Sequence, residues 1–234
     1  MSFLDLIFPK KCINCRRFGD FVCSDCFSRI KFNDNFQCPV CFRPSVNGLT
    51  HPVCKARYSL DGVISVVAYS PVTKRMIQQF KYKPYVSKLK DTIGEIMIEG
   101  LLQNESFYSF IEKYTPALIP VPLSMKKFRS RGYNHAELLA SYVAKYFHLV
   151  ISNKLLVRVK DTRPQYKLGK KERFENIRGA FNIRESAGRR TEIPKSVIII
   201  DDIATSFATL HEAAKVLKRA GTKKVLGITF AKEL

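Results

Sequence analysis

The sequence predicts an α/β fold with a parallel central sheet, preceded by a small metal-binding module. Apolar, β-branched segments alternate with amphipathic helical segments along most of the chain, which is the pattern of a parallel sheet covered by helices. All seven cysteines lie between Cys12 and Cys54, and 234 residues with 46% hydrophobic content are enough for one core and an appendage. We therefore expect a zinc-binding domain over residues 1–57 and an α/β domain over residues 58–234.

The α/β domain begins with a predicted strand over residues 62–69, of sequence GVISVVAY. A helix is expected over residues 73–82, because its apolar positions fall on one face, and a second helix over residues 89–102. Residues 117–121 predict a short apolar strand, and a basic loop separates it from a helix expected over residues 135–147. This order predicts a strand, loop and helix unit.

The second half of the domain predicts an excursion and then a parallel crossover. Residues 154–184 alternate apolar and basic positions before a highly charged stretch, which indicates a smaller unit outside the main sheet. Residues 197–200 are an all β-branched buried strand, residues 209–220 a helix that Gly221 stops, and residues 225–230 another strand. Strand, helix and strand in this order predict two parallel neighbours in one sheet.

The cysteine-rich segment predicts two structural Zn²⁺ sites. It holds three C-x2-C pairs and one H-x2-C pair, and this spacing lets a tight turn bring both side chains to one ion. Sequential pairing and interleaved, cross-braced pairing are both open, and His51 is either a ligand or a surface histidine. Protein groups would fill every coordination position, so we expect no open site for a substrate. The candidate ligands are Cys12, Cys15, Cys23, Cys26, Cys38, Cys41, His51 and Cys54.

The charge predicts an anionic partner, either nucleic acid or a phosphorylated ligand. Lys and Arg number 40 against 20 Asp and Glu, giving a net charge of +20. Residues 124–190 hold 17 basic and 5 acidic side chains, which indicates a binding face or, alternatively, an ordinary solvated surface. Aromatic residues among the basic ones would either stack the bases of single-stranded DNA or pack in the core. These are Tyr82, Tyr85, Phe128, Tyr133, Tyr166 and Phe174.

No apolar run approaches the roughly 20 residues of a membrane-spanning helix, so we expect neither export nor membrane insertion. A cytoplasmic location is therefore expected, where the thiols stay reduced and are free to bind metal.

The segment VIIIDDIATSFATL, residues 197–210, predicts a phosphate-binding loop. At the carboxyl end of a parallel strand, loop N–H groups and the start of the next helix converge on one anion. Asp201 and Asp202 would accept hydrogen bonds from paired sugar hydroxyls, or, alternatively, they only cap the helix. Thr205, Ser206 and Thr209 add hydroxyl donors. A phosphate beside a vicinal diol describes ribose 5-phosphate.

This segment resembles the diphosphoribose-binding signature of the type I phosphoribosyltransferases. The match comprises Asp201, Asp202, Thr205, Ser206, Ala208 and Thr209, and it departs at Phe207, where that family prefers glycine. Further stretches narrow the resemblance to the ComF competence family. These are residues 12–54 with their cysteine pairs, Phe80-Lys81-Tyr82, residues 120–123, residues 131–140, residues 158–165, Arg173, Asn176 and residues 179–181.

The resemblance implies a type I phosphoribosyltransferase fold, with a five-stranded parallel core and a small hood that hold the ligand between them. It implies a ligand of the phosphoribosyl pyrophosphate type, Mg²⁺ with its diphosphate, and Asp201 and Asp202 as the catalytic acids. The binding loop would be Thr205, Ser206, Phe207, Ala208 and Thr209. The guanidinium groups of Arg129 and Arg131 in the basic loop suit phosphate oxygens, and Arg163 and Arg173 would close over the site from the hood.

The resemblance also implies a role in DNA uptake and natural transformation, with single-stranded DNA and competence helicase or recombination-mediator proteins as partners. A transferase would displace pyrophosphate from C1 of the sugar and needs no dedicated nucleophile. His135 and His148 are accordingly interpreted as helix-start and helix-end residues. The alternatives are an inactive DNA-binding adaptor, an active phosphoribosyltransferase of nucleotide salvage, and a regulator that senses the ligand without turnover.

Overall fold

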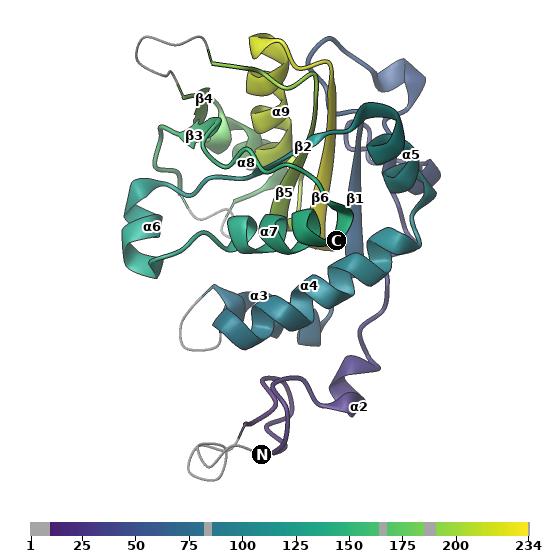
Figure 1. Ribbon diagram of the computed structural model, residues 1–234, viewed down its shortest axis with the longest axis vertical. Coiled ribbons are helices and arrows are strands. Elements are labelled where there is room, and N and C mark those ends of the chain that lie inside the picture. The colour runs from purple at the N-terminus through teal and green to yellow at the C-terminus, as the bar shows by residue number, and fades with distance from the viewer. Residues whose placement is uncertain (1–9, 82–85, 164–167, 185–190, 234) are drawn as a thin grey trace.

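The computed structural model describes residues 10–81, 86–163, 168–184 and 191–233. Its centre is a four-stranded parallel sheet in the order β1-β6-β5-β2, with helices on both faces (Figure 1). The strands are β1 (Gly62–Ala68), β2 (Ala117–Pro120), β5 (Ser196–Ala204) and β6 (Lys224–Lys232). The helices of this domain are α3 (Pro71–Phe80), α4 (Val86–Leu102), α5 (Glu105–Tyr114), α6 (Met125–Arg131), α7 (His135–Phe147), α8 (Lys170–Ile177) and α9 (Ala208–Ala220).

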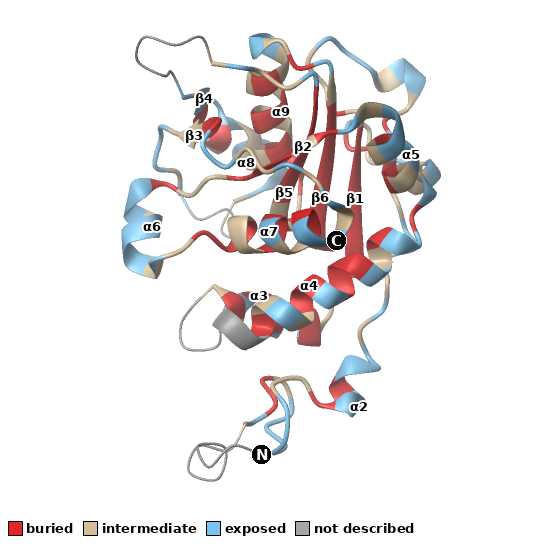
Figure 2. Ribbon diagram, in the orientation of Figure 1, coloured by how far each residue is buried: buried red, intermediate tan, exposed pale blue. Residues whose placement is uncertain are grey.

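Alternate residues of the strands build two cores, one on each face of the sheet. Ile198 and Ile200 of β5 pack with α3, α4, α5 and α7, whereas Val197 and Ile199 pack with α9 and the hood. A parallel strand between two helical layers is buried on both faces, which explains its continuous β-branched sequence. Figure 2 shows the central strands as buried and the outward helix faces as exposed.

The expected excursion is a small hood made of β3 (Leu156–Arg158), α8 and β4 (Phe181–Ile183). The two strands pair antiparallel, and Phe181 and Ile177 pack in the same core as α9. The hood therefore covers the face of the sheet on which α9 lies, as Figure 1 shows.

The structure differs from the expectations at four places. Strand β5 does not end at residue 200, because its pairing with β6 continues to Ala204 opposite Lys232, so the acidic pair lies inside the strand. The basic loop contains helix α6, and α5 was not foreseen; Asn104 caps α5 by accepting the N–H of Phe107 at 3.0 Å. The fifth strand implied by the resemblance is reduced, in the described chain, to one parallel bridge between Leu118 and Ile151.

In the described residues 10–57, the cysteine-rich segment holds only short elements, namely α2 (Ser24–Phe27) and the 3₁₀ turns η1 (Val46–Gly48) and η2 (Pro52–Cys54). Its later part is joined to the sheet by a bridge between Leu49 and Gly62. Gly48 has φ +80°, and a Cβ there would lie 2.0 Å from the carbonyl oxygen of Val63, so only glycine allows this close approach. Among the described helices, none is long and apolar enough to cross a bilayer.

Candidate zinc clusters and anion-binding site

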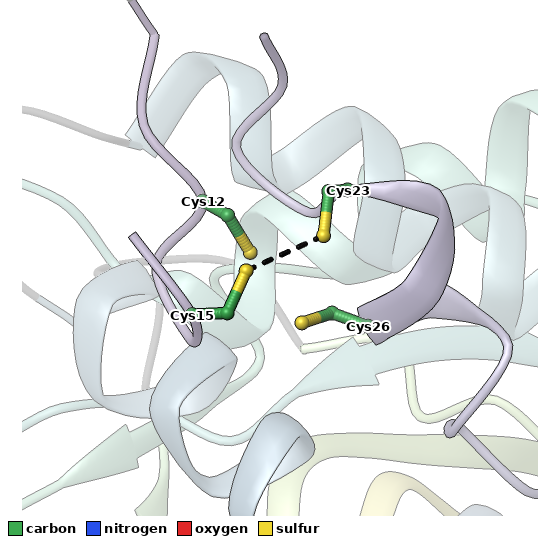
Figure 3. A group of neighbouring side chains, drawn as sticks. All are labelled: Cys12, Cys15, Cys23 and Cys26. Atoms are coloured by element: carbon green, nitrogen blue, oxygen red, sulfur yellow. Dashed lines mark hydrogen bonds between the residues drawn. The ribbon is translucent and has the colours of Figure 1, made fainter. Parts of the chain in front are cut away.

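The first metal cluster brings together Cys12, Cys15, Cys23 and Cys26 (Figure 3). Their sulfur atoms all lie within 4.8 Å of one another, and the Sγ atoms of Cys15 and Cys23 are 3.5 Å apart. Tetrahedral zinc with bonds of about 2.3 Å places its sulfur ligands about 3.8 Å apart. The four thiols therefore fit a Zn²⁺ ion without rearrangement of the backbone.

The second metal cluster brings together Cys38, Cys41, His51 and Cys54. The Nδ1 atom of His51 lies 3.3 Å from Sγ of Cys41, and its Nε2–H donates to the carbonyl oxygen of Pro44 at 3.0 Å. This hydrogen bond places the imidazole proton on Nε2 and leaves the Nδ1 lone pair for the metal. His51 thus lies with the three cysteines of the second cluster in a state suited to a metal ligand, and of the two pairings left open the structure groups the pairs sequentially.

Backbone N–H groups prepare the clusters for metal. Burial raises the pKa of the Cys12 thiol, but the N–H groups of Cys15, Cys23 and Asn14 outweigh it and lower the pKa to about 6. Equivalent N–H groups lower the pKa of Cys38 to about 7, again against the effect of burial. In the same clusters, against the effect of the N–H of Cys26, burial and neighbouring thiols raise the pKa of Cys23, and burial with neighbouring thiols raises the pKa of Cys54. Since the thiolate is the form that binds zinc, each cluster holds one thiol that ionises readily and another whose proton the metal has to displace.

Three elements meet at the carboxylate of Asp202 in β5. The ammonium group of Lys81, at the end of α3, lies 2.6 Å from Oδ2 of Asp202. The Nε2 atom of His135, the first residue of α7, lies 3.4 Å from Oδ1. His135 begins a helix as expected, and it is also 96% buried against the acidic pair. Asp202 is therefore held between a cation and an imidazole.

The two neighbouring acids have opposite pKa shifts. Burial raises the pKa of Asp202, but Lys81 and His135 outweigh it and hold the pKa well below its usual range. Burial and the charge of Asp202 raise the pKa of Asp201 to about 8. Burial also lowers the pKa of His135, against the opposing effect of Asp202. At neutral pH the pair therefore consists of one ionised and one protonated carboxyl group.

Two further cations lie within electrostatic range of this site, Lys127 of the charge of Lys81 and Arg158 of the carboxyl group of Asp201. Burial and the charges of Arg158, Arg131 and Lys81 lower the pKa of Lys127 in α6. Burial lowers the pKa of Arg158 in β3 as well, while the carboxyl group of Asp201 opposes this shift. Neighbouring cations thus disfavour the charged form of Lys127, and a bound anion would relieve this effect.

The loop between β5 and α9 contains a hydroxyl group and an aromatic ring that are both buried. The Oγ atom of Ser206 is inaccessible and has no hydrogen-bond partner within the described part of the chain. Phe207, the N-cap of α9, has φ +57° and is only 4% exposed. Its ring stacks on Phe42 of the cysteine-rich segment, with centroids 5.8 Å apart. Thr205 and Thr209 are half-buried, and Ala208 is the first residue of α9.

The four predicted arginines lie in different surroundings. An Nη1 atom of Arg131 lies 3.2 Å from Nδ1 of His135, which brings this arginine beside the acidic pair. Arg129 is exposed on α6. In the hood, Asn176 binds the backbone of Arg163 at 3.1 and 3.0 Å, and Nε of Arg173 donates to the carbonyl of Leu168 at 2.9 Å.

Sequence reasoning did not assign four residues to the site: Lys81, His135 and Arg158, which interact with the acidic pair, and Lys127, which interacts with Lys81 and Arg158. Lys81 and Arg158 stand in stretches that carry the family resemblance, which is the signal that would have found them.

Of the aromatic residues predicted to stack bases or pack in the core, Tyr82, Tyr85 and Tyr166 lie outside the described residues. Phe128 is 42% exposed on α6, Tyr133 donates its hydroxyl to the carbonyl of Phe80, and Phe174 packs on the core below α9.

The fold and the clusters define an α/β protein consistent with the phosphoribosyltransferase type, joined to a zinc-ribbon module. The family model of the double zinc ribbon domain matches residues 3–56. Competence protein F of Haemophilus influenzae is 28% identical over 228 residues, which cover 93% of this chain and 95% of that protein. Competence protein ComFC of Bacillus subtilis is 27% identical over 86% of this chain and 79% of its own length. DNA utilization protein YhgH of Escherichia coli K12 is 25% identical over 87% of each chain.

These matches confirm the resemblance to the ComF family of competence proteins over most of the chain.

Proposed function

We propose that the carboxyl end of β5 binds a ligand of the phosphoribosyl pyrophosphate type. One observation carries the proposal: an acidic pair, with Asp202 buried and Asp201 half-buried, and several cations meet at the same edge of the sheet. An acidic pair suits the hydroxyl groups of a sugar, and the cations suit the oxygens of phosphate groups. A phosphoribosyl diphosphate combines both in one molecule. The cations are Lys81, Lys127, Arg131 and Arg158.

The two acids take different roles in this proposal. Asp202 is engaged by Lys81 and His135, so it orients the site from within. Asp201, whose Oδ1 already accepts the N–H of Asp202 at 2.9 Å, would contact the ribose hydroxyls. The unpartnered hydroxyl of Ser206 and the start of α9 would hold the 5-phosphate, because both provide donors at the point where β5 ends.

The Mg²⁺ that the resemblance implies would be held by Asp201 and the diphosphate. Ligand atoms of His135, Asp201 and Asp202 lie within 4.8 Å of one another. The ammonium group of Lys81 already lies against Asp202, however, and an ion directly between the two carboxylates would face this positive charge. When bound, Mg²⁺ would neutralise charge on the diphosphate.

Turnover is a separate part of the proposal from binding. In a transferase, Lys127, Arg131 and Arg158 would stabilise the charge that develops on the departing pyrophosphate. In an adaptor or sensor, the same groups would only hold the ligand. Release of pyrophosphate in the presence of candidate nucleobase acceptors distinguishes the two.

A role in DNA uptake is the cellular part of the proposal. It is supported by relatives named as competence and DNA utilization proteins. A second candidate function, binding of single-stranded DNA, is favoured by α6, where Met125 is 63% and Phe128 42% exposed beside Lys126 and Arg129. Exposed aromatic and basic side chains on one short helix suit stacked bases and backbone phosphates. Competence helicase or recombination-mediator proteins are the proposed protein partners.

Calorimetric titration with phosphoribosyl pyrophosphate and Mg²⁺ tests the ligand. We expect saturable binding to the unmodified chain and a loss of about tenfold or more in affinity for Asp201→Asn, because the carboxyl group beside the sugar hydroxyls is replaced by an amide that cannot ionise when Mg²⁺ binds. The matched control is Asp91→Asn, an exposed acid of α4. Absence of heat with the unmodified chain, or equal affinity of all three proteins, contradicts the proposal.

A further inference from the structure

Phe207 stands where the phosphoribosyltransferase signature prefers glycine, and the structure gives the reason why a large side chain is tolerated. Its backbone is left-handed, with φ +57° and ψ +6°, a conformation that side chains rarely adopt without compensation. The ring is buried rather than exposed at the loop. The compensation therefore comes from what the ring contacts.

The contact is with the second metal cluster. Phe42 follows Cys41 directly, and its N–H donates to the carbonyl oxygen of Cys38 at 2.9 Å, which closes the knuckle. The rings of Phe42 and Phe207 stack at 5.8 Å with an interplanar angle of 22°. The ammonium group of Lys170 lies 3.3 Å from the centroid of Phe42, on the hood side of the pair. The position of Phe42 is thus set by the same turn that presents two zinc ligands.

Two more contacts join the same two surfaces. The imidazole Nε2–H of His211, in the first turns of α9, donates to the carbonyl of Pro39 at 2.8 Å, and Pro39 lies between Cys38 and Cys41. The buried ammonium group of Lys232, at the end of β6, donates to Gln37 just before the knuckle. The loop and the start of α9 are therefore held by the residues on and beside one metal knuckle.

The first cluster contacts helix α3 instead of the loop before α9, so it provides an internal comparison. Arg75 of α3 donates to the carbonyl and side-chain oxygens of Asn14, between Cys12 and Cys15. In Figure 1 helix α2 lies beyond α3 and α4, well apart from α9. The two clusters thus contact opposite parts of the α/β domain.

We propose that Phe42 and Phe207 are positioning residues that couple metal loading of the second cluster to the conformation of the loop at residues 205–209. The knuckle has no apolar core of its own, so metal supplies the energy that fixes it. When the knuckle is fixed, Phe42 and Pro39 hold the loop and the start of α9. On the ligand side this inference rests on the proposed function: zinc and the phosphoribosyl ligand would then each increase the affinity of the other by the same factor.

Hydrogen exchange measured by mass spectrometry tests the coupling without any ligand. Cys54→Ser removes a ligand of the second cluster, and Cys15→Ser is the matched variant of the first. We expect exchange in residues 205–211 to increase roughly threefold or more in Cys54→Ser and to stay unchanged in Cys15→Ser. Equal exchange in the two variants overturns the proposal.

Phe207→Gly separates the ring contact from general loss of structure. Glycine accepts the left-handed backbone, so this variant should fold and retain two zinc ions. In this background the addition of Cys54→Ser should no longer raise exchange in residues 205–211. If Cys54→Ser raises exchange in residues 205–211 as much in the Phe207→Gly chain as in the chain that retains Phe207, the coupling does not pass through the aromatic pair and this assignment is overturned.

The reciprocal effect is measured as release of zinc to a coloured chelator. At equilibrium with the chelator, phosphoribosyl pyrophosphate with Mg²⁺ should raise the zinc affinity of the second cluster by the factor by which loss of that zinc weakens ligand binding, and should leave the first cluster unaffected. If calorimetry detects no binding to the unmodified chain, the proposed function fails, and the exchange measurements still decide the coupling. If the ligand binds and protects neither cluster or both equally, the coupling is overturned.

Discussion

The ammonium group of Lys81 lies 2.6 Å from Oδ2 of Asp202, with 22% of the lysine side chain and 5% of the aspartate side chain exposed. This ion pair ties the end of α3 to the central strand of the sheet. Charges removed from water are stabilising only while they are paired, and breaking such a pair leaves the partner uncompensated. The pair therefore contributes both to the stability of the fold and to the electrostatics of the proposed ligand site.

Lys81→Met should lower the free energy of unfolding by about 2 to 3 kcal/mol at neutral pH, because Asp202 stays buried without its main counter-charge. Urea denaturation followed by circular dichroism measures this difference. The matched control is Lys90→Met, which breaks an ion pair with Asp91 in which 38% of the lysine side chain and 55% of the aspartate side chain are exposed. Because this pair is exposed, the control should change stability by less than about 0.5 kcal/mol. Equal effects of the two substitutions would show that the buried pair has no special role.

The destabilisation by Lys81→Met should shrink as the pH falls from 7 to 4. In the unmodified chain the pKa of Asp202 lies below its ordinary value of 3.8, so its stabilising contribution is present above about pH 4 and is lost only at lower pH. In the variant the pKa of Asp202 is higher, so the buried carboxyl takes up a proton earlier. Unfolding curves over this pH range check the trend, and a constant difference contradicts it.

Asp201→Asn should remove a decline in stability with increasing pH. The pKa of Asp201 is raised to about 8 in the folded chain, above its ordinary value of 3.8. The stabilising contribution of the Asp201 carboxyl group is therefore greatest below pH 4. It decreases as the pH rises from about 4 to about 8, because over this range the group is ionised in the unfolded chain but still protonated in the folded chain, and it is lost by about pH 8. We expect the unmodified chain to lose stability relative to Asp201→Asn between pH 5 and pH 8. Parallel stability profiles of the two proteins contradict this assignment.

Single cysteine substitutions should remove one zinc ion each. Cys15→Ser should leave the second cluster loaded and Cys54→Ser the first, because the two ligand sets share no residue. Native mass spectrometry counts the ions, with the unmodified chain expected to carry two. Loss of both ions from a single substitution would show that the clusters do not load independently.

Phe128→Ala with Arg129→Gln should weaken binding of single-stranded DNA by about tenfold, since one stacked ring and one phosphate contact are lost from α6. The slope of affinity against salt should also become shallower, because fewer counterions are released. Fluorescence anisotropy with a labelled oligonucleotide measures both effects. Tyr146→Ala, which removes a 51% exposed aromatic residue of α7, is the control. Equal losses in the two proteins contradict a role for α6.

The sequence predicted the regular elements best where burial and caps act together. The helix at His135–Phe147 was predicted with its observed bounds, and the helix after the loop to within one residue. Apolar periodicity marks both helices, Asn134 caps the start of α7, and Gly221 ends α9. Helix α6 was missed because it has no buried residue and is held by its ends, with Ser124 as N-cap and Gly132 in a left-handed turn.

The candidate site could be predicted only where its residues are neighbours in the sequence. The acidic pair and the hydroxyl-rich loop form one short motif, whereas Lys81, His135 and Arg158 reach it from three separate elements. The role of Phe207 depends on Phe42, in a segment whose placement is decided by metal ligands rather than by periodicity. No local pattern contains such tertiary contacts.

The contacts of Pro39 with His211 and of Gln37 with Lys232 join positions 172 and 195 residues apart. During translation the metal-binding segment leaves the ribosome well before the helix and strand that complete its surroundings. The ring of Phe42 therefore lacks its stacking partner until Phe207 has been synthesised. A nascent chain that stalls before α9 would therefore expose one face of the Phe42 ring to chaperones and proteases.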